Sequence, residues 1–221
     1  MNDEIELKIA EGKANGLVDK VKIDVGLSHN APISRKWLEM HNDRFVIGIE
    51  PDPGNAANAR RDLGGNDRFA LIEAACDLGN GEKVFYHITN ADTGCSSLNK
   101  PTAREGWEYE KVTVKTINLA DLLKYLLTEY TFIEQIKTDT QGHDEIVLKS
   151  VKEYLPFVAF YDFELADSRQ YDLSYKPHTR TELINFMEEQ DFAFLERSFD
   201  NLRFANKRFS QRRDLTNECA V

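Results

Sequence analysis

The chain has 221 residues, of which 41% are hydrophobic and 30% are charged, and its formal net charge is -10. This composition fits one folded globular domain and excludes an intrinsically disordered chain or a disulfide-rich scaffold, since only three cysteines occur. The negative charge argues against general binding to nucleic acid, which relies on Lys and Arg neutralising phosphates. Neither a membrane span nor a signal peptide is found, so we expect a cytoplasmic protein with reduced thiols and no membrane partner.

The first part of the chain alternates between short apolar runs and helical stretches. In order, the pattern predicts a strand at 21–25, a helix at 34–42, a strand at 44–50, a helix at 55–64 and a strand at 69–76. Such alternation favours right-handed parallel crossovers and a doubly wound sheet.

The rest of the chain continues the pattern with one interruption. Strands are predicted at 81–89, 109–117, 132–139 and 157–165, helices at 118–130, 143–155 and 179–191, and a terminal hairpin at 192–197 and 201–207. The interruption is the long polar loop 90–106, and loops of this length in compact domains are usually functional. We therefore predict one α/β domain over 21–207, an N-terminal extension at 1–20 and a C-terminal tail at 208–221.

The first strand ends in a turn that resembles a cofactor loop without its usual glycines. Asp24 and Gly26 suit that role, but Ser28, His29 and Asn30 stand where further glycines usually allow a pyrophosphate to approach the backbone. NAD and FAD are therefore disfavoured. S-adenosylmethionine has no phosphate and does not need such a close approach to the backbone of the turn.

Glu50 ends the second strand, more than 20 residues after the first turn. At this place in a doubly wound sheet a carboxylate can accept hydrogen bonds from both hydroxyls of a ribose. The alternative is a strand-end carboxylate that only faces water. The joint occurrence with Asp24 and Gly26 favours a nucleoside site.

Six ordered motifs give the chain its resemblance to a known family. They are IDVG (23–26), VIGIEPDP (46–53), the AAC-D turn with GEKVFYHI (74–88), GCSSL (94–98), VKTINLADLL (114–123) and IKTDTQGHDEIVLKS (136–150). In this order they resemble the FkbM-type methyltransferases of the class I, S-adenosylmethionine-dependent superfamily. The resemblance implies a Rossmann-like, mostly parallel seven-stranded sheet with an antiparallel C-terminal strand.

The resemblance also implies a set of residues around the cofactor. The residues expected to contact the cofactor are Asp24, Gly26 and Ser28 of the first turn, Glu50, the turn Ala75, Cys76 and Asp77 beside the adenine, and Asn90. Family members usually carry Asn and Gly at the positions of Ser28 and Asn30, so the opening loop departs from the family pattern.

Methyl transfer requires alignment of the nucleophile with the methyl group, and an alcohol or amine also benefits from a general base. Asp139 is the first candidate, with His143 and Glu164 as further catalytic residues. Asp139 could instead cap the following helix, and two carboxylates here could instead hold a divalent metal ion.

A polar acceptor is expected near the long loop and after the last central strand. Ser96 and Ser97 offer hydroxyls, while Tyr175 and His178 suit a sugar or another polar molecule. We therefore predict an O-methyltransferase acting on a sugar, glycan or small metabolite. A non-catalytic binding protein and a nucleotide-sugar or dinucleotide enzyme on a similar sheet stay as alternatives.

Overall fold

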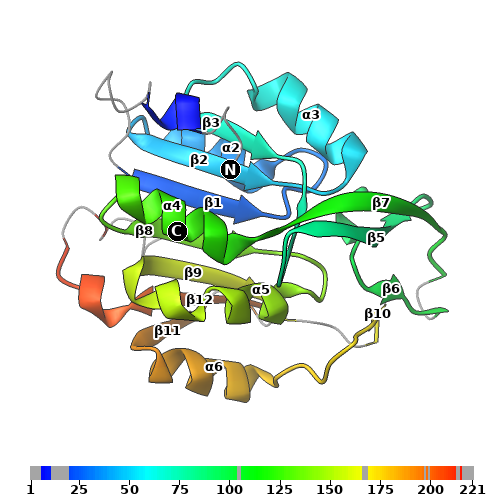
Figure 1. Cartoon of the computed structure of the whole chain (residues 1–221). Coiled ribbons are helices and arrows are strands. Elements are labelled where there is room, and N and C mark those ends of the chain that lie inside the picture. Colours follow the sequence, from blue (N-terminus) through cyan, green and yellow to red (C-terminus); the bar gives the residue numbers. More distant parts are fainter. Residues whose placement is uncertain are drawn as a thin grey trace.

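A seven-stranded sheet forms the centre of the molecule, with the strand order β11-β12-β9-β8-β1-β2-β3 (Figure 1). The computed structural model describes residues 6–10, 20–103, 106–165, 169–196, 198, 200–212 and 215. The strands are β1 (Lys20–Val25), β2 (Arg44–Ile49), β3 (Phe69–Ile72), β8 (Ile133–Thr138), β9 (Val158–Glu164), β11 (Phe192–Glu196) and β12 (Asn201–Asn206). β12 is antiparallel to both neighbours and the other pairs are parallel, which confirms the predicted sheet and terminal hairpin.

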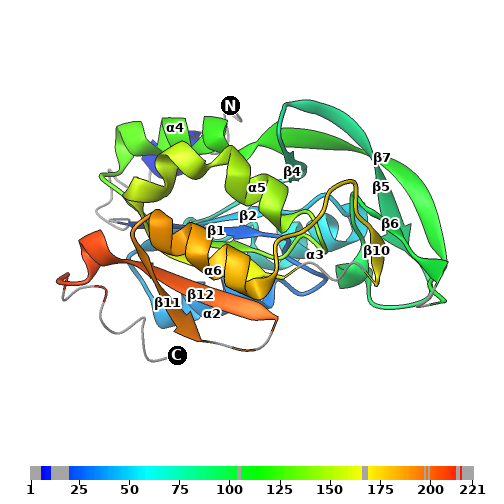
Figure 2. The same cartoon turned by 90° about the horizontal axis from the view of Figure 1, so that it is seen from below.

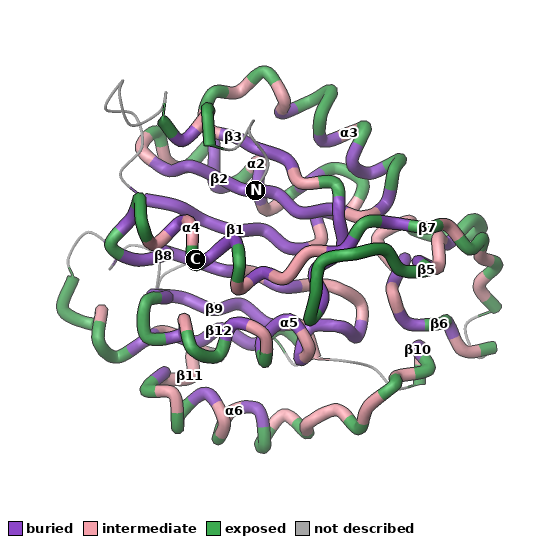
Figure 3. The backbone as a smooth tube through the Cα atoms, in the orientation of Figure 1, coloured by how far each residue is buried: buried purple, intermediate pink, exposed green. Residues whose placement is uncertain are grey.

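Helices cover both faces of this sheet, as the view from below shows (Figure 2). They are α2 (Pro32–Met40), α3 (Pro53–Leu63), α4 (Leu119–Glu129), α5 (Asp144–Ser150) and α6 (Arg180–Glu189). Trp37 and Leu63, from α2 and α3, join one apolar cluster, while Leu123, Val147 and Met187, from α4, α5 and α6, join the other. Because both faces are covered, the strands at the centre are buried along their length (Figure 3).

Side chains at the start of several helices satisfy backbone N–H groups that the helix itself leaves unpaired. Asp52 accepts hydrogen bonds from the N–H groups of Gly54 and Asn55 at the start of α3. Asn118 caps α4 in the same way, and Thr179 forms a capping box with Glu182 at α6. These caps fix where the chain leaves each strand end, and so they fix the loops around the carboxyl edge of the sheet.

A second, three-stranded sheet stands beside the first and was not expected. It contains β4 (Ala75–Asp77), β5 (Gly81–Ile88) and β7 (Tyr109–Asn118), in the order β4-β7-β5. The predicted strand 69–76 is therefore wrong as one element, because β3 pairs with β2 and β4 pairs with β7. The strand predicted at 81–89 is confirmed as β5, which pairs antiparallel with β7.

Two further differences concern the long loop and the helix that was expected at 143–155. The loop contains the 3-10 turn η1 (Thr93–Cys95) and β6 (Lys100–Pro101), which pairs with β10 (Tyr171–Asp172). The helix is α only as far as Ser150, and the 3-10 segment η3 (Lys152–Phe157) follows it. Pro156 has no N–H group to donate and disfavours α-helical geometry in the residue before it, which explains the change.

Candidate active site

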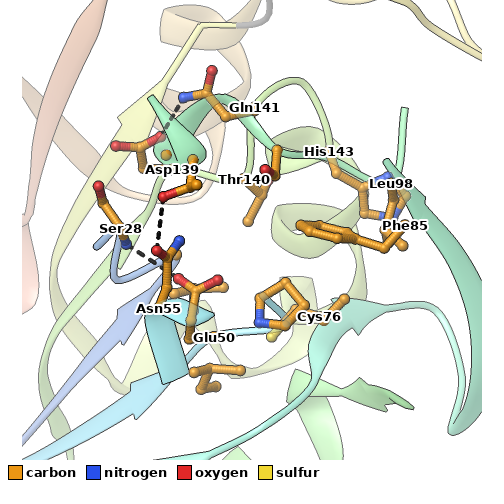
Figure 4. Close-up of a pocket in the computed structure, with 18 of the residues that line it drawn as sticks. Ser28, Glu50, Asn55, Cys76, Phe85, Leu98, Asp139, Thr140, Gln141 and His143 are labelled. Carbon is orange, nitrogen blue, oxygen red and sulfur yellow. Dashed lines mark hydrogen bonds between the residues drawn. The ribbon is translucent and has the colours of Figure 1, made fainter. Parts of the chain in front are cut away.

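A cavity of about 240 Å³ lies at the carboxyl edge of the large sheet, where the strand order reverses between β1 and β8 (Figure 4). We call one part of its wall the charged end, which consists of Gly26, Ser28, Glu50, Asn55, Asp139 and Gln141. We call the other part the apolar end, which consists of Ala75, Cys76, Phe85, Leu98 and His143. Figure 4 shows Ser28, Asp139 and Gln141 on one side of the cavity and Phe85, Leu98 and His143 on the other.

The Glu50 carboxylate lies between the first two loops and binds both of them. One of its oxygens accepts hydrogen bonds from the N–H groups of Leu27, at 2.8 Å, and Ser28, at 3.1 Å. The other accepts from the N–H of Asp52 at 2.8 Å. Burial raises the pKa of Glu50 to about 7, although these three donors oppose the shift.

The first loop follows an unusual backbone path. Gly26 has a φ of 81°, and a Cβ atom added to it would lie 1.9 Å from the carbonyl oxygen of Asp139. Ser28 and Ala31 also have positive φ values, of 57° and 45°, which are uncommon for residues other than glycine. Gly26 therefore allows the loops after β1 and β8 to touch, while Ser28 and Ala31 hold a strained turn.

Asp24 lies behind this loop and does not line the cavity. Its carboxylate accepts hydrogen bonds from the N–H and the hydroxyl of Ser34, at 3.0 and 2.7 Å, near the start of α2. Its other oxygen lies 3.2 Å from the ammonium of Lys137. The structure thus places Asp24 where it supports the loop.

Asp139 reaches the cavity wall within a group of charged and polar side chains. The Nε2 atom of Gln141 donates to Asp139 at 2.7 Å and to Glu164 at 2.8 Å. The ammonium of Lys137 lies 3.6 Å from Asp139 and donates to the carbonyl oxygen of Gly26 at 2.6 Å. Asp139 and Glu164 are thus brought together, as expected for neighbouring strand ends, although only Asp139 lines the cavity.

The two carboxyl groups differ in how tightly they hold a proton. Burial acts against ionisation of Asp139, but Lys137 and hydrogen bonds from Glu164 and Gln141 hold its pKa below the ordinary value. Burial and the negative charge of Asp139 raise the pKa of Glu164 to about 10. Near neutral pH the pair therefore holds one proton, on Glu164, and one negative charge, on Asp139.

His143 lies at the start of α5, in the apolar end, and binds the Asp77 side chain. Its Nε2 atom is 3.0 Å from a carboxylate oxygen of Asp77, whose other oxygen pairs with Lys83. Burial lowers the pKa of His143 despite the neighbouring Asp77 carboxylate. Burial acts against ionisation of Asp77, but Lys83 and His143 hold its pKa below the ordinary value, and Asp77 itself does not line the cavity.

The segment Asp92–Ser96 forms a third wall and connects the two ends. The Thr93 hydroxyl donates to the Asn55 side chain at 2.8 Å, and a Cβ atom on Gly94 would lie 2.7 Å from the Ser28 hydroxyl oxygen. Ser96 also lines the cavity, and its hydroxyl accepts from the N–H of Ile88 at 3.0 Å. These contacts place the predicted loop directly over the cavity.

The remaining predicted residues lie outside the cavity. Ser97 is fully buried and donates to the carbonyl oxygen of Gln141 at 2.8 Å, while Asn90 is exposed and accepts from the N–H of Glu108. Tyr175 donates to the carbonyl oxygen of Gly142 at 2.9 Å and lines a second hollow, of about 390 Å³. His178 binds Glu145 at 2.6 Å and lines neither of these spaces.

Sequence reasoning missed Asn55, Gln141 and Phe85, which all line the cavity. Asn55 ends the turn-forming run PDPGN and Gln141 precedes a glycine after a strand, so the sequence around each residue indicates a turn and no particular role. Phe85 follows the alternation of β5, but that pattern does not say which surface a strand covers. Pairing between β5 and β7 brings it to the cavity.

The described part of the chain contains neither a metal-binding cluster nor a membrane-spanning helix. There, no three side chains of His, Cys, Asp or Glu gather in a way that could hold a metal ion. In the same residues, no helix has both the length and the apolar character to cross a bilayer.

The groups that are present fit S-adenosylmethionine. Glu50 uses one oxygen for a single N–H donor, so that oxygen keeps a lone pair for a ribose hydroxyl. Ala75, Phe85 and Leu98 offer apolar surface for an adenine ring. The buried Nδ1 atom of His143 has no hydrogen-bond partner in the described structure, which is typical of a position that a ligand completes.

Comparisons with known proteins agree with this reading. The model of the Methyltransferase FkbM domain matches residues 19–197. The chain is 28% identical, over 166 residues, to the 2-O-methyltransferase NoeI of Sinorhizobium fredii (strain NBRC 101917 / NGR234), which covers 70% of this chain. The chain spans 66% of the length of NoeI, slightly less than two thirds.

Solved structures resemble the fold at low sequence identity. The crystal structure of Methyltransferase FkbM from Methylobacillus flagellatus KT is 12% identical, has a TM-score of 0.51, and is matched over 85% of this chain and 43% of that chain. The SAH-bound methyltransferase PaMTH1 of Podospora anserina is 13% identical, has a TM-score of 0.46, and is matched over 91% of this chain and 76% of that one.

These matches confirm the predicted family and fold, and through the family they confirm S-adenosylmethionine as the cofactor. Because the family model covers most of its length, the chain belongs to the Methyltransferase FkbM domain family.

Proposed function

We propose that the protein transfers a methyl group from S-adenosylmethionine to a hydroxyl of a sugar, a glycan or another small polar metabolite. The family match supports methyl transfer, and the similarity to a protein named as a 2-O-methyltransferase supports oxygen as the acceptor atom. The observation that carries the proposal is the ionised Asp139 carboxylate at the cavity wall, between Lys137 and Gln141.

Asp139 accepts the proton of the acceptor hydroxyl. When bound, S-adenosylmethionine supplies a methyl group on a positively charged sulfur, and the acceptor oxygen forms its bond to that carbon as the carbon–sulfur bond breaks. The hydroxyl proton must leave in the same process, and a positioned carboxylate can take it. Asp139 is suited because about a third of its side chain is exposed toward the cavity, while Glu164 already holds a proton.

Lys137 and Gln141 are positioning residues for Asp139. Lys137 keeps Asp139 ionised and, through the carbonyl of Gly26, ties it to the first loop. Gln141 fixes the orientation of the carboxylate from the other side and links it to Glu164. This arrangement favours a single direction of approach for the acceptor, since the other sides of Asp139 are occupied by protein.

The acceptor is expected to enter from the hollow between β6 and β10. This hollow is lined by Lys100, Asp172 and Tyr175, among others, and so combines charged groups with an aromatic ring, a mixture that suits a sugar. The Tyr171 side chain lines the hollow and contacts the cavity wall, since its hydroxyl lies 2.7 Å from the carbonyl oxygen of Cys95 and 2.9 Å from Gln141, which both line the cavity. Of the predicted substrate residues, Ser96 and Tyr175 face these two spaces.

The substitution Asp139→Asn tests this proposal. The amide can still accept from Gln141 but cannot take a proton, so we expect turnover to fall by at least about 100-fold, while affinity for S-adenosylhomocysteine changes less than about threefold. Turnover is measured as radiolabelled methyl transfer from S-adenosylmethionine to a panel of mono- and oligosaccharides, and affinity by calorimetry. The matched control is Asp67→Asn, an exposed carboxyl outside the cavity, which should leave both unchanged.

Two results would contradict the proposal in different ways. Full turnover by the Asp139→Asn variant would show that Asp139 is not the proton acceptor. A wild-type protein that binds neither S-adenosylmethionine nor S-adenosylhomocysteine would instead point to the alternative of a binding protein that has kept the fold without the activity.

A further inference from the structure

The apolar end of the cavity is shaped for a flat ring. Ala75 and Phe85 are buried there, and Leu98 and Cys76 complete a wall without charged groups. In Figure 4 Glu50, the candidate partner of the ribose, lies below Asp139 and to the left of Cys76, with Phe85 and Leu98 across the cavity. A nucleoside whose ribose meets Glu50 and whose sulfur faces Asp139 therefore places its base against Phe85 and Leu98.

His143 is the histidine of this wall, and Asp77 fixes which of its ring nitrogens carries the hydrogen. The Asp77 carboxylate is ionised and can only accept hydrogen bonds, so the Nε2 atom of His143, 3.0 Å away, must carry the hydrogen. The neutral ring then has a lone pair on Nδ1. That atom is buried and has no hydrogen-bond partner in the described structure, although His143 lines the cavity.

Asp77 is not available for the same purpose. It does not line the cavity, and its two oxygens bind His143 and Lys83 instead. The family resemblance puts the turn 75–77 beside the adenine. The side chain that lines the cavity there is the imidazole of His143, from the start of α5, and not the carboxylate of Asp77 to which it is bound.

We propose that His143 is a specificity-determining residue for the cofactor, whose Nδ1 atom accepts a hydrogen bond from the 6-amino group of the adenine. The inference rests on the proposed use of S-adenosylmethionine, and it gives His143 a binding role where the sequence suggested a catalytic one. A base with a 6-oxo group turns a lone pair toward Nδ1 and is disfavoured, because two acceptors then face each other in a buried site.

The substitution His143→Gln distinguishes the role of Nδ1 from the role of Nε2. The amide nitrogen of glutamine can replace Nε2 as donor to Asp77, but its acceptor oxygen is bonded to the same terminal carbon and does not take the place of Nδ1 beside Cγ. We expect the wild-type protein to bind S-adenosylhomocysteine at least about tenfold more tightly than S-inosylhomocysteine, its 6-oxo analogue. In the variant, affinity for S-adenosylhomocysteine should fall about tenfold and the preference between the two ligands should largely disappear.

The control is His41→Gln, which removes a histidine outside the cavity and should leave both affinities unchanged. Thermal unfolding of the free proteins shows whether the His143→Gln variant folds, and His143→Phe, which keeps a flat ring without an acceptor, provides a second variant if it does not. Calorimetry with the two homocysteine ligands needs no methyl acceptor, so the outcome does not depend on finding the substrate.

A His143→Gln variant that binds S-adenosylhomocysteine as the wild type does, or that keeps the preference for the 6-amino ligand, would overturn the inference. Loss of turnover with unchanged S-adenosylhomocysteine affinity would overturn it too, in favour of a general base. If the wild type binds neither ligand, the proposed function itself fails, which is a distinguishable result.

Discussion

The two ends of the cavity are held in place by different kinds of interaction. The charged end consists of loops that follow parallel strands, and its side chains are held by a network of ions and hydrogen bonds around Lys137, Asp139 and Glu50. The apolar end comes from a separate small sheet and is held by packing, with one histidine whose ring is fixed by Asp77. The charged end contains buried charges and a strained backbone, whereas the apolar end consists of packed uncharged side chains and one histidine.

This difference assigns the two ends different tasks. Buried charges that neutralise each other can hold a proton acceptor in a defined state, which a reaction requires. A packed apolar slot with one oriented acceptor can select a ligand but cannot move a proton to the substrate. Changes at the charged end should therefore alter stability and its dependence on pH, and the following predictions test that expectation.

The largest effect expected at a single pH is that of Gly26→Ala. A methyl group there would lie 1.9 Å from the carbonyl oxygen of Asp139, and the φ of 81° is unfavourable for alanine. The loops after β1 and β8 must then separate, so we expect the free energy of unfolding to fall by about 3–5 kcal/mol. Urea denaturation followed by circular dichroism measures it.

The matched control for Gly26→Ala is Gly79→Ala, since a Cβ atom on Gly79 meets nothing within 4 Å. That variant should unfold within about 0.5 kcal/mol of the wild type. If the Gly26→Ala protein were as stable as the control, the close approach of the two loops would not exist in solution.

The substitution Glu164→Gln should change how stability depends on pH. Burial and Asp139 raise the pKa of Glu164 to about 10 in the folded protein, whereas the unfolded chain loses that proton near pH 4.5. The folded state therefore holds one more proton between these values, and stability falls as the pH rises through the window. Glutamine cannot titrate, so the variant should gain about 1.4 kcal/mol relative to wild type for each pH unit between pH 5 and pH 9.

Urea denaturation at pH 5, 7 and 9 measures this difference, with Glu110→Gln as the control because Glu110 is exposed on β7. The control should differ from the wild type by a small amount that does not change with pH. A difference between Glu164→Gln and wild type that is the same at all three pH values would contradict the sharing of one proton between Glu164 and Asp139.

The sequence predicted residues at both ends of the cavity, but it missed Phe85 at the apolar end and Asn55 and Gln141 at the charged end, for physical reasons. Gly26, Glu50 and Asp139 follow strands of a parallel sheet, and the ends of such strands always meet at one edge. Phe85 reaches the cavity only because β5 pairs with β7 and β4 pairs with β7 instead of joining the large sheet. The local periodicity of a strand does not predict which distant strand it pairs with. Asn55 and Gln141 are polar residues in turns, where many roles look alike in sequence.

The smallest predicted effect concerns the strain at Ser28, whose position in the family is usually occupied by Asn. With a φ of 57°, Ser28 adopts a left-handed conformation that costs a residue with a Cβ atom about 1 kcal/mol more than glycine. Ser28→Gly should therefore be more stable than Ser28→Ala by about 1 kcal/mol. At Ser210, where φ is -58°, the order should reverse, because glycine there only adds freedom to the unfolded chain. Thermal denaturation of the four variants gives both differences, and the same order at both positions would mean that the loop after β1 is not held in the left-handed turn that brings Ser28 to the cavity wall.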